Sequence, residues 1–302
     1  MDEDQDTPMY DAESDFYGDE DVVKDLNKKV ANFDVKTWWQ THETPATIPP
    51  AQGASHDISH LHNPYAGDEY AWQLTETIEA FLARVPPATT PQTPTNRWIW
   101  TCNPHIKRQP RKAAANQRVR GGEDEAPEAE GADLATLMQA GEERLHFASD
   151  FIEQCRRPGV PSDFIARESR KAGADAANDI LNLARALRVT CGKWLLFRPA
   201  SEVNEVWGVI AKATAGNKLG IAAKVEPMNT AVQRPGRLIC VYTADFSDRA
   251  DVIRVARKLK QLGLASETLY YKPDAFTYLG IASSNPWRIK ASLYDTKVLL
   301  GE

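Results

Sequence analysis

The chain has 302 residues, 42% of them hydrophobic, which is enough for one sizeable core or for two domains of ordinary size. No apolar run approaches the roughly 20 residues that cross a bilayer, and the first residues lack the basic and apolar regions of a secretory signal. The formal net charge of −6 is uneven, because residues 1–25 carry −10 and the rest of the chain carries +4. We therefore expect an intracellular protein of the cytoplasm, the nucleus or both, with no membrane partner and with a mildly basic folded part that allows a phosphate-containing partner.

The first 62 residues have the composition of a tail and a linker. Residues 1–20 are acidic and poor in aliphatic side chains, so we expect them to be disordered. Residues 21–62 contain a weak helical pattern that ends near Trp38 and Trp39, followed by a stretch rich in Pro, Thr, Ala, Gly and Ser. We interpret 21–62 as a short helix plus a linker, and 63–302 as one folded domain.

Residues 63–302 alternate between helical and strand patterns. Apolar residues at helical spacing predict helices over about 68–84, 133–155, 162–188, 203–216 and 247–262. Dense or alternating apolar runs predict strands over about 96–102, 193–197, 219–225, 237–243, 268–272 and 288–294. Two successive strands without a helix between them argue against a wholly parallel sheet. The expected fold class is α+β, with a curved, mainly antiparallel sheet and helices packed on its convex face.

A loop of about 105–132 separates its charges. The stretch from Lys107 to Arg120 contains six basic residues and no acid, and the stretch from Glu123 to Glu130 contains five acids. We expect this loop to be mobile. Four of its basic residues could track a nucleic-acid backbone or act as a nuclear import signal, although a solvated charged loop is the simpler interpretation. They are Lys107, Arg108, Arg111 and Lys112.

Candidate ligand-binding residues lie mostly on the expected strands. Trp98 and Trp100 are two residues apart, so both point to the same face of the sheet. On the concave face they would stack on a base, whereas on the convex face they would belong to the core, which is the commoner role of large aromatics. Four basic residues could contribute to a phosphate-binding rim, although a solvated charged face is the simpler interpretation: Arg170, Lys171, Lys193 and Lys224. Tyr242 is a further candidate for ligand binding. Another patch combines Tyr270, Tyr271 and Lys272 with Arg288 and Lys290.

Three segments resemble, in the same order, the family of cap-binding translation initiation factors. Asn96–Trp100, Gly192–Leu195 and Ile239–Thr243 are similar to that family's Asn-Arg-Trp, Gly-Arg-Trp-Leu and Ile-Ala-Ile-Trp strands. A more specific resemblance, over about 63–302, is to the basophilic leukemia expressed protein family, which shares that fold. It is carried by Trp98–Trp100 with Asn103–Pro104, Glu168–Arg170 with Ala177–Ile180, Gly192–Trp194, Val241–Thr243 with Asp245–Phe246, and Tyr271–Asp274. This resemblance implies the fold and no particular activity.

The residues with which the cap-binding factors hold methylated guanine are missing. That family places the base between two Trp rings and reads its edge with a carboxylate. Here the stretch Ala186–Thr190 before the Gly-Lys-Trp strand has neither Trp nor Glu, and the stretch from His105 to Gly122 has no aromatic beyond His105. A stacked aromatic contributes about 1–3 kcal/mol per base, so the loss of both rings predicts no specific recognition of a methylated cap.

No signature of an enzyme is present in the sequence. The common phosphate-loop, dinucleotide, metalloprotease and nucleophile-elbow motifs are absent, and only His105 and His146 fall within 63–302. The four cysteines lie more than thirty residues apart, so we expect reduced, buried thiols and neither a metal nor a cofactor. We expect a binding protein that engages RNA or a nucleotide on the concave face. The alternative is a protein-interaction adaptor that uses its helical face or its acidic N-terminal segment, and an enzyme for a phosphorylated small molecule is a third interpretation.

Overall fold

The computed structural model describes residues 24, 28, 59–110, 124–229 and 236–301 of the chain. The chain divides into two compact units, residues 1–56 and 57–302, and the elements named below belong to the second unit. The expected acidic tail (1–20) and most of the expected helix and linker (21–62) lie outside the described residues. Within the described ranges, no helix is both long enough and apolar enough to cross a membrane.

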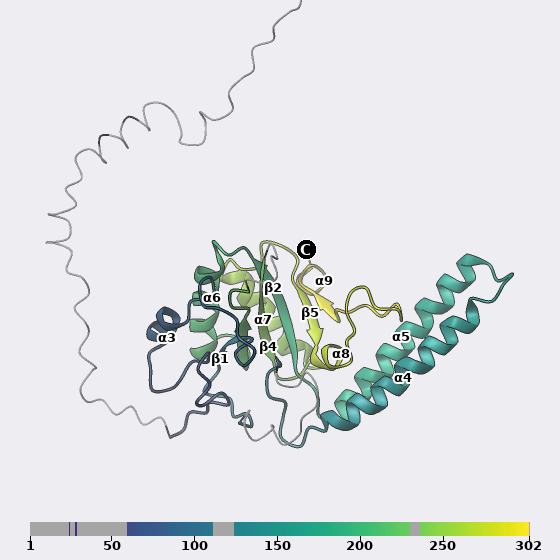
Figure 1. The fold of residues 1–302 in the computed structure, drawn as a ribbon, viewed down its shortest axis with the longest axis horizontal. Coiled ribbons are helices and arrows are strands. Elements are labelled where there is room, and N and C mark those ends of the chain that lie inside the picture. The colour runs from purple at the N-terminus through teal and green to yellow at the C-terminus, as the bar shows by residue number, and fades with distance from the viewer. Residues whose placement is uncertain (1–23, 25–27, 29–58, 111–123, 230–235, 302) are drawn as a thin grey trace, which may run out of the picture. The chain divides into compact units, whose positions relative to one another are not determined.

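A six-stranded antiparallel sheet organises the second unit (Figure 1). Its strands follow the order β1-β3-β4-β2-β5-β6, and neighbouring strands are antiparallel. The strands are β1 (Ile99–Cys102), β2 (Gly192–Arg198), β3 (Ala222–Val225), β4 (Arg237–Thr243), β5 (Tyr270–Pro273) and β6 (Tyr294–Asp295). The expected α+β class with an antiparallel sheet is confirmed.

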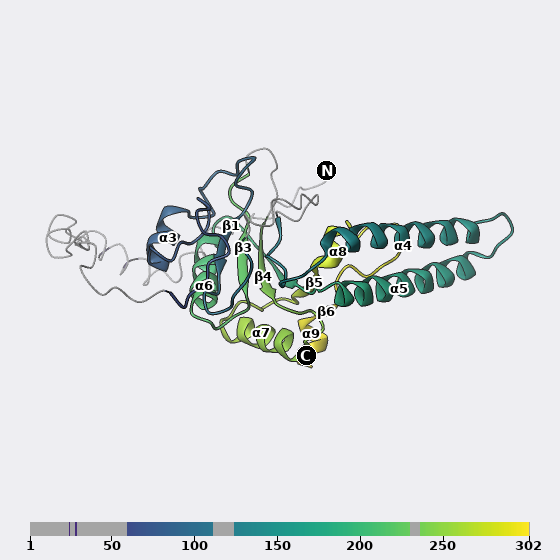
Figure 2. The ribbon, with the colours of Figure 1, turned by 90° about the horizontal axis from the view of Figure 1, so that it is seen from below.

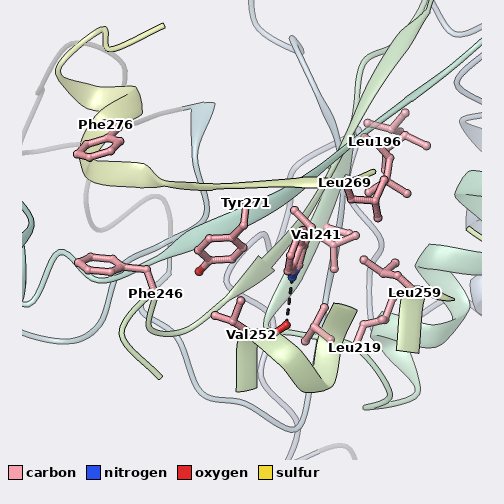
Figure 3. Close-up of a cluster of buried hydrophobic side chains, with 14 of the residues drawn as sticks. Leu196, Leu219, Val241, Phe246, Val252, Leu259, Leu269, Tyr271 and Phe276 are labelled. Atoms are coloured by element: carbon pink, nitrogen blue, oxygen red, sulfur yellow. Dashed lines mark hydrogen bonds between the residues drawn. The ribbon is translucent and has the colours of Figure 1, made fainter. Parts of the chain in front are cut away.

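Two amphipathic helices cover one face of this sheet, which we call the helix face. They are α6 (Val203–Ala215) and α7 (Arg249–Gln261), which lie on the same side of the strands in Figure 2. Alternate residues of the central strands, such as Leu196 of β2 and Val241 of β4, pack with Val252 and Leu259 of α7 in the cluster of Figure 3. The Trp194 indole N–H donates to the carbonyl oxygen of Val252 at 3.3 Å. The helix face is therefore an apolar core in which the indole N–H of Trp194 is paired.

A long helical hairpin extends from the sheet in Figures 1 and 2. It consists of α4 (Leu134–Cys155) and α5 (Ser162–Ala186), which pack against each other. The C-terminal part of the chain approaches the backbone of α5 closely, since a Cβ at Gly173 would lie 2.2 Å from the carbonyl oxygen of Trp287. Short helices complete the unit: α3 (Ile78–Arg84), α8 (Asp274–Tyr278) and α9 (Thr296–Leu300).

The helix expected over 68–84 is wrong in its first half. Helix α3 begins only at Ile78, because the Thr77 side chain caps it by accepting from the N–H of Ala80 at 3.1 Å. The residues before it form turns closed by the Gln73 amide, which donates to the carbonyl oxygens of Tyr65 and Ala71 at 3.2 and 3.1 Å. Side-chain bonds to the backbone thus replace the helical bonds that the apolar spacing predicted.

The strand expected over 288–294 is also wrong, since β6 contains only Tyr294 and Asp295. The Asn285 side chain closes a loop there, because it donates to the carbonyl oxygens of Ala282 and Ile289 at 2.7 Å and accepts from the N–H of Ile289 at 3.1 Å. A backbone bound to a side chain in this way is unavailable to a strand.

Candidate functional site

The sheet face opposite the helix face, which we call the concave face, carries most of the candidate residues. Strand register places two rows of side chains across it. One row contains Trp100, Lys224, Cys240, Leu195 and Tyr270. The other contains Cys102, Ala222, Tyr242, Lys193 and Lys272. Lysines from two central strands therefore meet aromatic side chains on this face.

Trp100 is buried on the concave face by the segment that precedes β1, and not by helices. The backbone N–H of Trp100 donates to the carbonyl oxygen of Tyr70 at 2.9 Å, and its carbonyl oxygen accepts from the backbone N–H of Trp72 at 3.0 Å. The Tyr65 ring stacks on the Trp100 indole with 4.8 Å between ring centroids. Only 1% of Trp100 is exposed, so Tyr65 occupies the position that a stacked base would need.

A short acidic segment, residues 124–128, covers the centre of the concave face, and we call it the strap. Its Glu125 carboxylate accepts from Lys193 Nζ at 2.5 Å, from Tyr242 Oη at 2.5 Å and from Lys224 Nζ at 3.2 Å. Lys224 Nζ also donates to the carbonyl oxygen of Asp124. The mobile loop expected over about 105–132 stays a prediction, and residues 111–123 of it lie outside the described part. Within the described part of that loop, Glu125 neutralises the two lysines.

A second carboxylate completes this charged cluster. Asp274, the first residue of α8, accepts from Lys193 Nζ at 2.7 Å, and the Thr277 hydroxyl accepts from the same Nζ at 3.0 Å. Burial raises the pKa of Glu125, but Lys193 and Lys224 outweigh burial and hold that pKa below its usual range. Burial raises the pKa of Asp274 as well, and there the attraction of Lys193 offsets only part of the effect. Glu125 is therefore the ionised partner on which the lysines converge.

The indole of Trp98, the residue just before β1, lies beside this cluster. Lys224 Nζ is 3.9 Å from the centroid of the Trp98 ring, which is a cation–π distance. Trp98 is half-buried, and its buried Nε1 has no hydrogen-bond partner among the described residues. Its ring therefore borders the site and is sensitive to the charge within it.

The C-terminal end of the strap is anchored by Glu128. One of its carboxylate oxygens accepts from the backbone N–H groups of Thr190 and Cys191, both at 3.0 Å. Burial raises the pKa of Glu128 to about 8, and the nearby Asp274 adds to the effect. The anchor is consequently held by a carboxyl group that its surroundings favour in the protonated form.

Beyond the strap, one end of the concave face is exposed, and we call it the open end. Phe197 is 60% exposed and Tyr270 is 50% exposed, although both belong to strands of the sheet. Leu195 pairs with Tyr270 and Phe197 pairs with Leu238, so the two rings are diagonal neighbours on one face. Lys272 follows two residues after Tyr270 on the same face, and burial, followed by repulsion from Lys193, lowers its pKa to about 8. The open end thus presents two aromatic rings beside a cation.

The chain matches the model of the family "Basophilic leukemia-expressed protein Bles03" over residues 26–280. It belongs to that family. Three similar solved structures are complexes of eIF4E proteins with cap or cap analogues. Schistosome eIF4E with m7GpppA and 4E-BP is 14% identical, and the match covers 36% of this chain and 60% of that chain with a TM-score of 0.29. C. elegans eIF4E-3 with the 4E-binding protein Mextli and a cap analogue is 18% identical, and the match covers 30% of this chain and 54% of that chain with a TM-score of 0.26. Ascaris suum eIF4E-3 with m7G cap is 17% identical, and the match covers 28% of this chain and 52% of that chain with a TM-score of 0.24. The chain thus spans between 52% and 60% of the length of these structures, and the likeness concerns only part of the fold.

The remaining candidate residues of this Bles03-family chain lie away from the concave face or outside the described part. Arg170 and Lys171 are exposed on α5, in the hairpin, so they are not neighbours of Lys193 and Lys224. Lys107 is exposed and Arg108 is half-buried, whereas positions 111 and 112 are outside the described residues. In the described part of the chain, no three His, Cys, Asp or Glu side chains come together as a metal site.

Two central residues of the site were missed by sequence reasoning. Glu125 lies 68 positions before Lys193, and nothing in its acidic neighbourhood distinguishes it from a solvated charge. Phe197 ends a dense apolar run, Trp194–Phe197, that suggests burial on both faces. A strict reading of alternation along β2 would have placed Phe197 on the same face as Lys193, and this was the one available signal.

Proposed function

We propose that this protein is a non-catalytic binding module that takes single-stranded RNA or a nucleotide on the concave face, with unpaired bases at the open end. One observation carries the proposal: Phe197 and Tyr270 expose their rings at diagonally adjacent positions of a sheet face that also bears Lys272. A location in the cytoplasm, the nucleus or both is part of this proposal.

The physical case rests on what an exposed aromatic pair does on a sheet. Large apolar side chains that gather on an exposed surface mark binding sites more often than isolated ones do. Bases stack on such rings whatever their identity, with about 1–3 kcal/mol per base, and a neighbouring lysine neutralises a phosphate. The ligand class that combines flat rings with phosphates is a nucleotide or a single strand of RNA. Because Trp100 is covered by Tyr65, preference for a methylated cap is not part of the proposal.

Binding of short, unstructured, fluorescently labelled RNAs to the full chain tests the proposal. The double variant Phe197→Ala with Tyr270→Ala should bind about 5-fold to 150-fold more weakly than the wild type, which corresponds to about 1–3 kcal/mol of stacking. Phe147→Ala is the matched control, since Phe147 is 66% exposed but lies on α4. Affinity should also fall as salt rises. Equal affinity of wild type and double variant, or binding that ignores salt, would refute the proposal.

A protein-interaction adaptor is the second candidate, and a separate observation favours it. The hairpin exposes three phenylalanines, with Phe147 at 66%, Phe151 at 44% and Phe164 at 43%. The first two are four residues apart and lie on one side of α4. If Phe147→Ala with Phe151→Ala abolishes capture of protein partners while RNA never binds, the adaptor function replaces RNA binding. The alternative segment for recruitment, the acidic N-terminus, lies outside the described residues.

A further inference from the structure

We infer that the centre of the concave face is a phosphate-binding site that Glu125 of the strap occupies from within the chain, and that a phosphate group binds there when the strap withdraws. The inference concerns the covered part of the face and does not depend on RNA binding at the open end.

The donors of this site come from three adjacent strands. Lys193 of β2, Lys224 of β3 and Tyr242 of β4 direct Nζ, Nζ and Oη at one carboxylate, at 2.5, 3.2 and 2.5 Å. Each of the three residues is at most 4% exposed. Paired strands hold these donors in place, so the donor set remains when the acceptor leaves. A phosphate group offers the same anionic oxygens as the carboxylate and can accept more hydrogen bonds.

Without the strap, this set has an excess of positive charge. Glu125 and Glu128 would leave together, because both belong to residues 124–128. Lys193 would retain Asp274, whereas Lys224 would lose both the Glu125 carboxylate and the Asp124 carbonyl oxygen. Buried lysines add little to stability compared with apolar side chains of similar size, so their place in central strands calls for another role. Binding of an external anion is such a role.

The strap is attached in a way that allows its release. Its backbone makes no backbone–backbone hydrogen bond to any described residue, and side chains supply its ties. One tie is the Arg97–Asp124 ion pair, whose arginine is 61% exposed and which is therefore weak. Another is the carboxyl group of Glu128, which its burial favours in the protonated form. At the three donors an external phosphate competes with the Glu125 carboxylate, and not with a paired strand.

The closed strap lowers the apparent affinity of the site for phosphate. The apparent affinity for phosphate is reduced by the fraction of molecules whose strap is open. A substitution that loosens the strap without touching the three donors should raise the affinity. Glu128→Ala is such a substitution, because Glu128 accepts from the backbone N–H groups of residues 190 and 191 and is not itself bonded to Lys193, Lys224 or Tyr242.

The first experiment uses inorganic phosphate as the probe and thermal unfolding as the readout, on the full chain. Glu125→Ala should unfold at a lower temperature than the wild type and recover several degrees with phosphate, while chloride at equal ionic strength does not restore it. Adding Lys224→Met to Glu125→Ala should abolish the recovery. Glu128→Ala should bind phosphate about tenfold more tightly than the wild type. Equal responses to phosphate and chloride in Glu125→Ala and Glu128→Ala would overturn the inference.

A second experiment needs only the wild type and so holds even if the variants fail to fold. Hydrogen exchange of the amides of Thr190 and Cys191, which bond Glu128, should accelerate when excess phosphate displaces the strap, and the total tryptophan fluorescence, to which Trp98 contributes, should change with it. Exchange and fluorescence that stay the same in phosphate and in chloride would overturn the inference. An RNA with a 5′-phosphate, compared with the same RNA ending in a hydroxyl, then distinguishes a nucleic-acid source of the phosphate from a small molecule. Failure of RNA binding at the open end leaves these outcomes unaffected.

Discussion

The two faces of the sheet are buried by different physical means, although the same strands supply both. On the helix face, Trp194 and Leu196 of β2 pack under helices with other apolar side chains. On the concave face, Lys193 of the same strand is just as buried, but it is matched by Glu125 and Asp274. Consecutive residues of a strand point to opposite faces of the sheet, so Lys193 belongs to a charged core and Trp194 to an apolar one.

The difference indicates which face sets stability and which face is free to change. Apolar burial is favourable wherever it occurs and needs no specific partner. A buried ion pair must offset the desolvation of both charges, so it contributes little, yet it becomes costly when one partner is missing. The helix face should therefore dominate the free energy of unfolding, and the concave face should respond to substitutions in pairs and to ligands.

The largest expected effect is on the helix face. Trp194→Ala should lower the free energy of unfolding by about 3–5 kcal/mol, because it leaves a cavity between the sheet and α7. Urea unfolding followed by circular dichroism measures it. Phe197→Ala, in the same strand but on the exposed side, is the control and should stay within about 0.5 kcal/mol of the wild type. Similar losses for both variants would remove the distinction between the faces.

The next effect tests pairing on the concave face. Glu125→Leu should destabilise the protein by about 3 kcal/mol, because it leaves Lys224 buried without a carboxylate. The double variant Glu125→Leu with Lys224→Met should recover at least half of that loss, since the Lys193–Asp274 pair remains intact. Thermodynamic coupling between the two substitutions is the measured quantity. Simple additivity of their effects would contradict the paired description.

A smaller effect is expected when Glu is replaced by Gln at either of two positions of the strap, 125 or 128. Glu125→Gln should cost about 2 kcal/mol at neutral pH, because it weakens charged hydrogen bonds. At Glu128 the pKa is raised from 4.5 to about 8, so this carboxyl contributes stability that is fully present below about 4.5 and is lost as pH rises through about 8. Unfolding free energies between pH 5 and pH 8 should therefore shift steadily in favour of Glu128→Gln relative to the wild type. A difference that does not change with pH would count against a protonated anchor.

The smallest effect concerns the open end. Burial lowers the pKa of Lys272 to about 8, and the charged groups that face it are Lys193, Glu125 and Asp274. Its positive charge is lost as pH rises through that value, so RNA affinity should fall by up to about fivefold between pH 7 and pH 9. Lys272→Arg keeps its charge and should flatten the profile. Parallel pH profiles for the wild type and this variant would assign the pH dependence to another group.

Much of the fold was predictable from periodicity. The patterns over 133–155 and 162–188 correspond to α4 and α5 within a few residues, and the strand over 237–243 corresponds to β4. These elements have long apolar stripes that local sequence reveals. The failures over 68–77 and 288–293 occur where Gln73 and Asn285 bind the backbone with their side chains. Such bonds depend on the conformation of a whole loop, which periodicity does not capture.

By itself, the sequence determined which side chains of one strand share a face. Strand pairing then places Trp100, Lys193, Lys224 and Tyr242 on one side of the antiparallel sheet. Only the tertiary structure decided that Glu125 lies among them and that Tyr65 covers Trp100. The physical reason is that a strand's pattern specifies the direction of each side chain, whereas the partner that a buried charge requires can come from any distance along the chain.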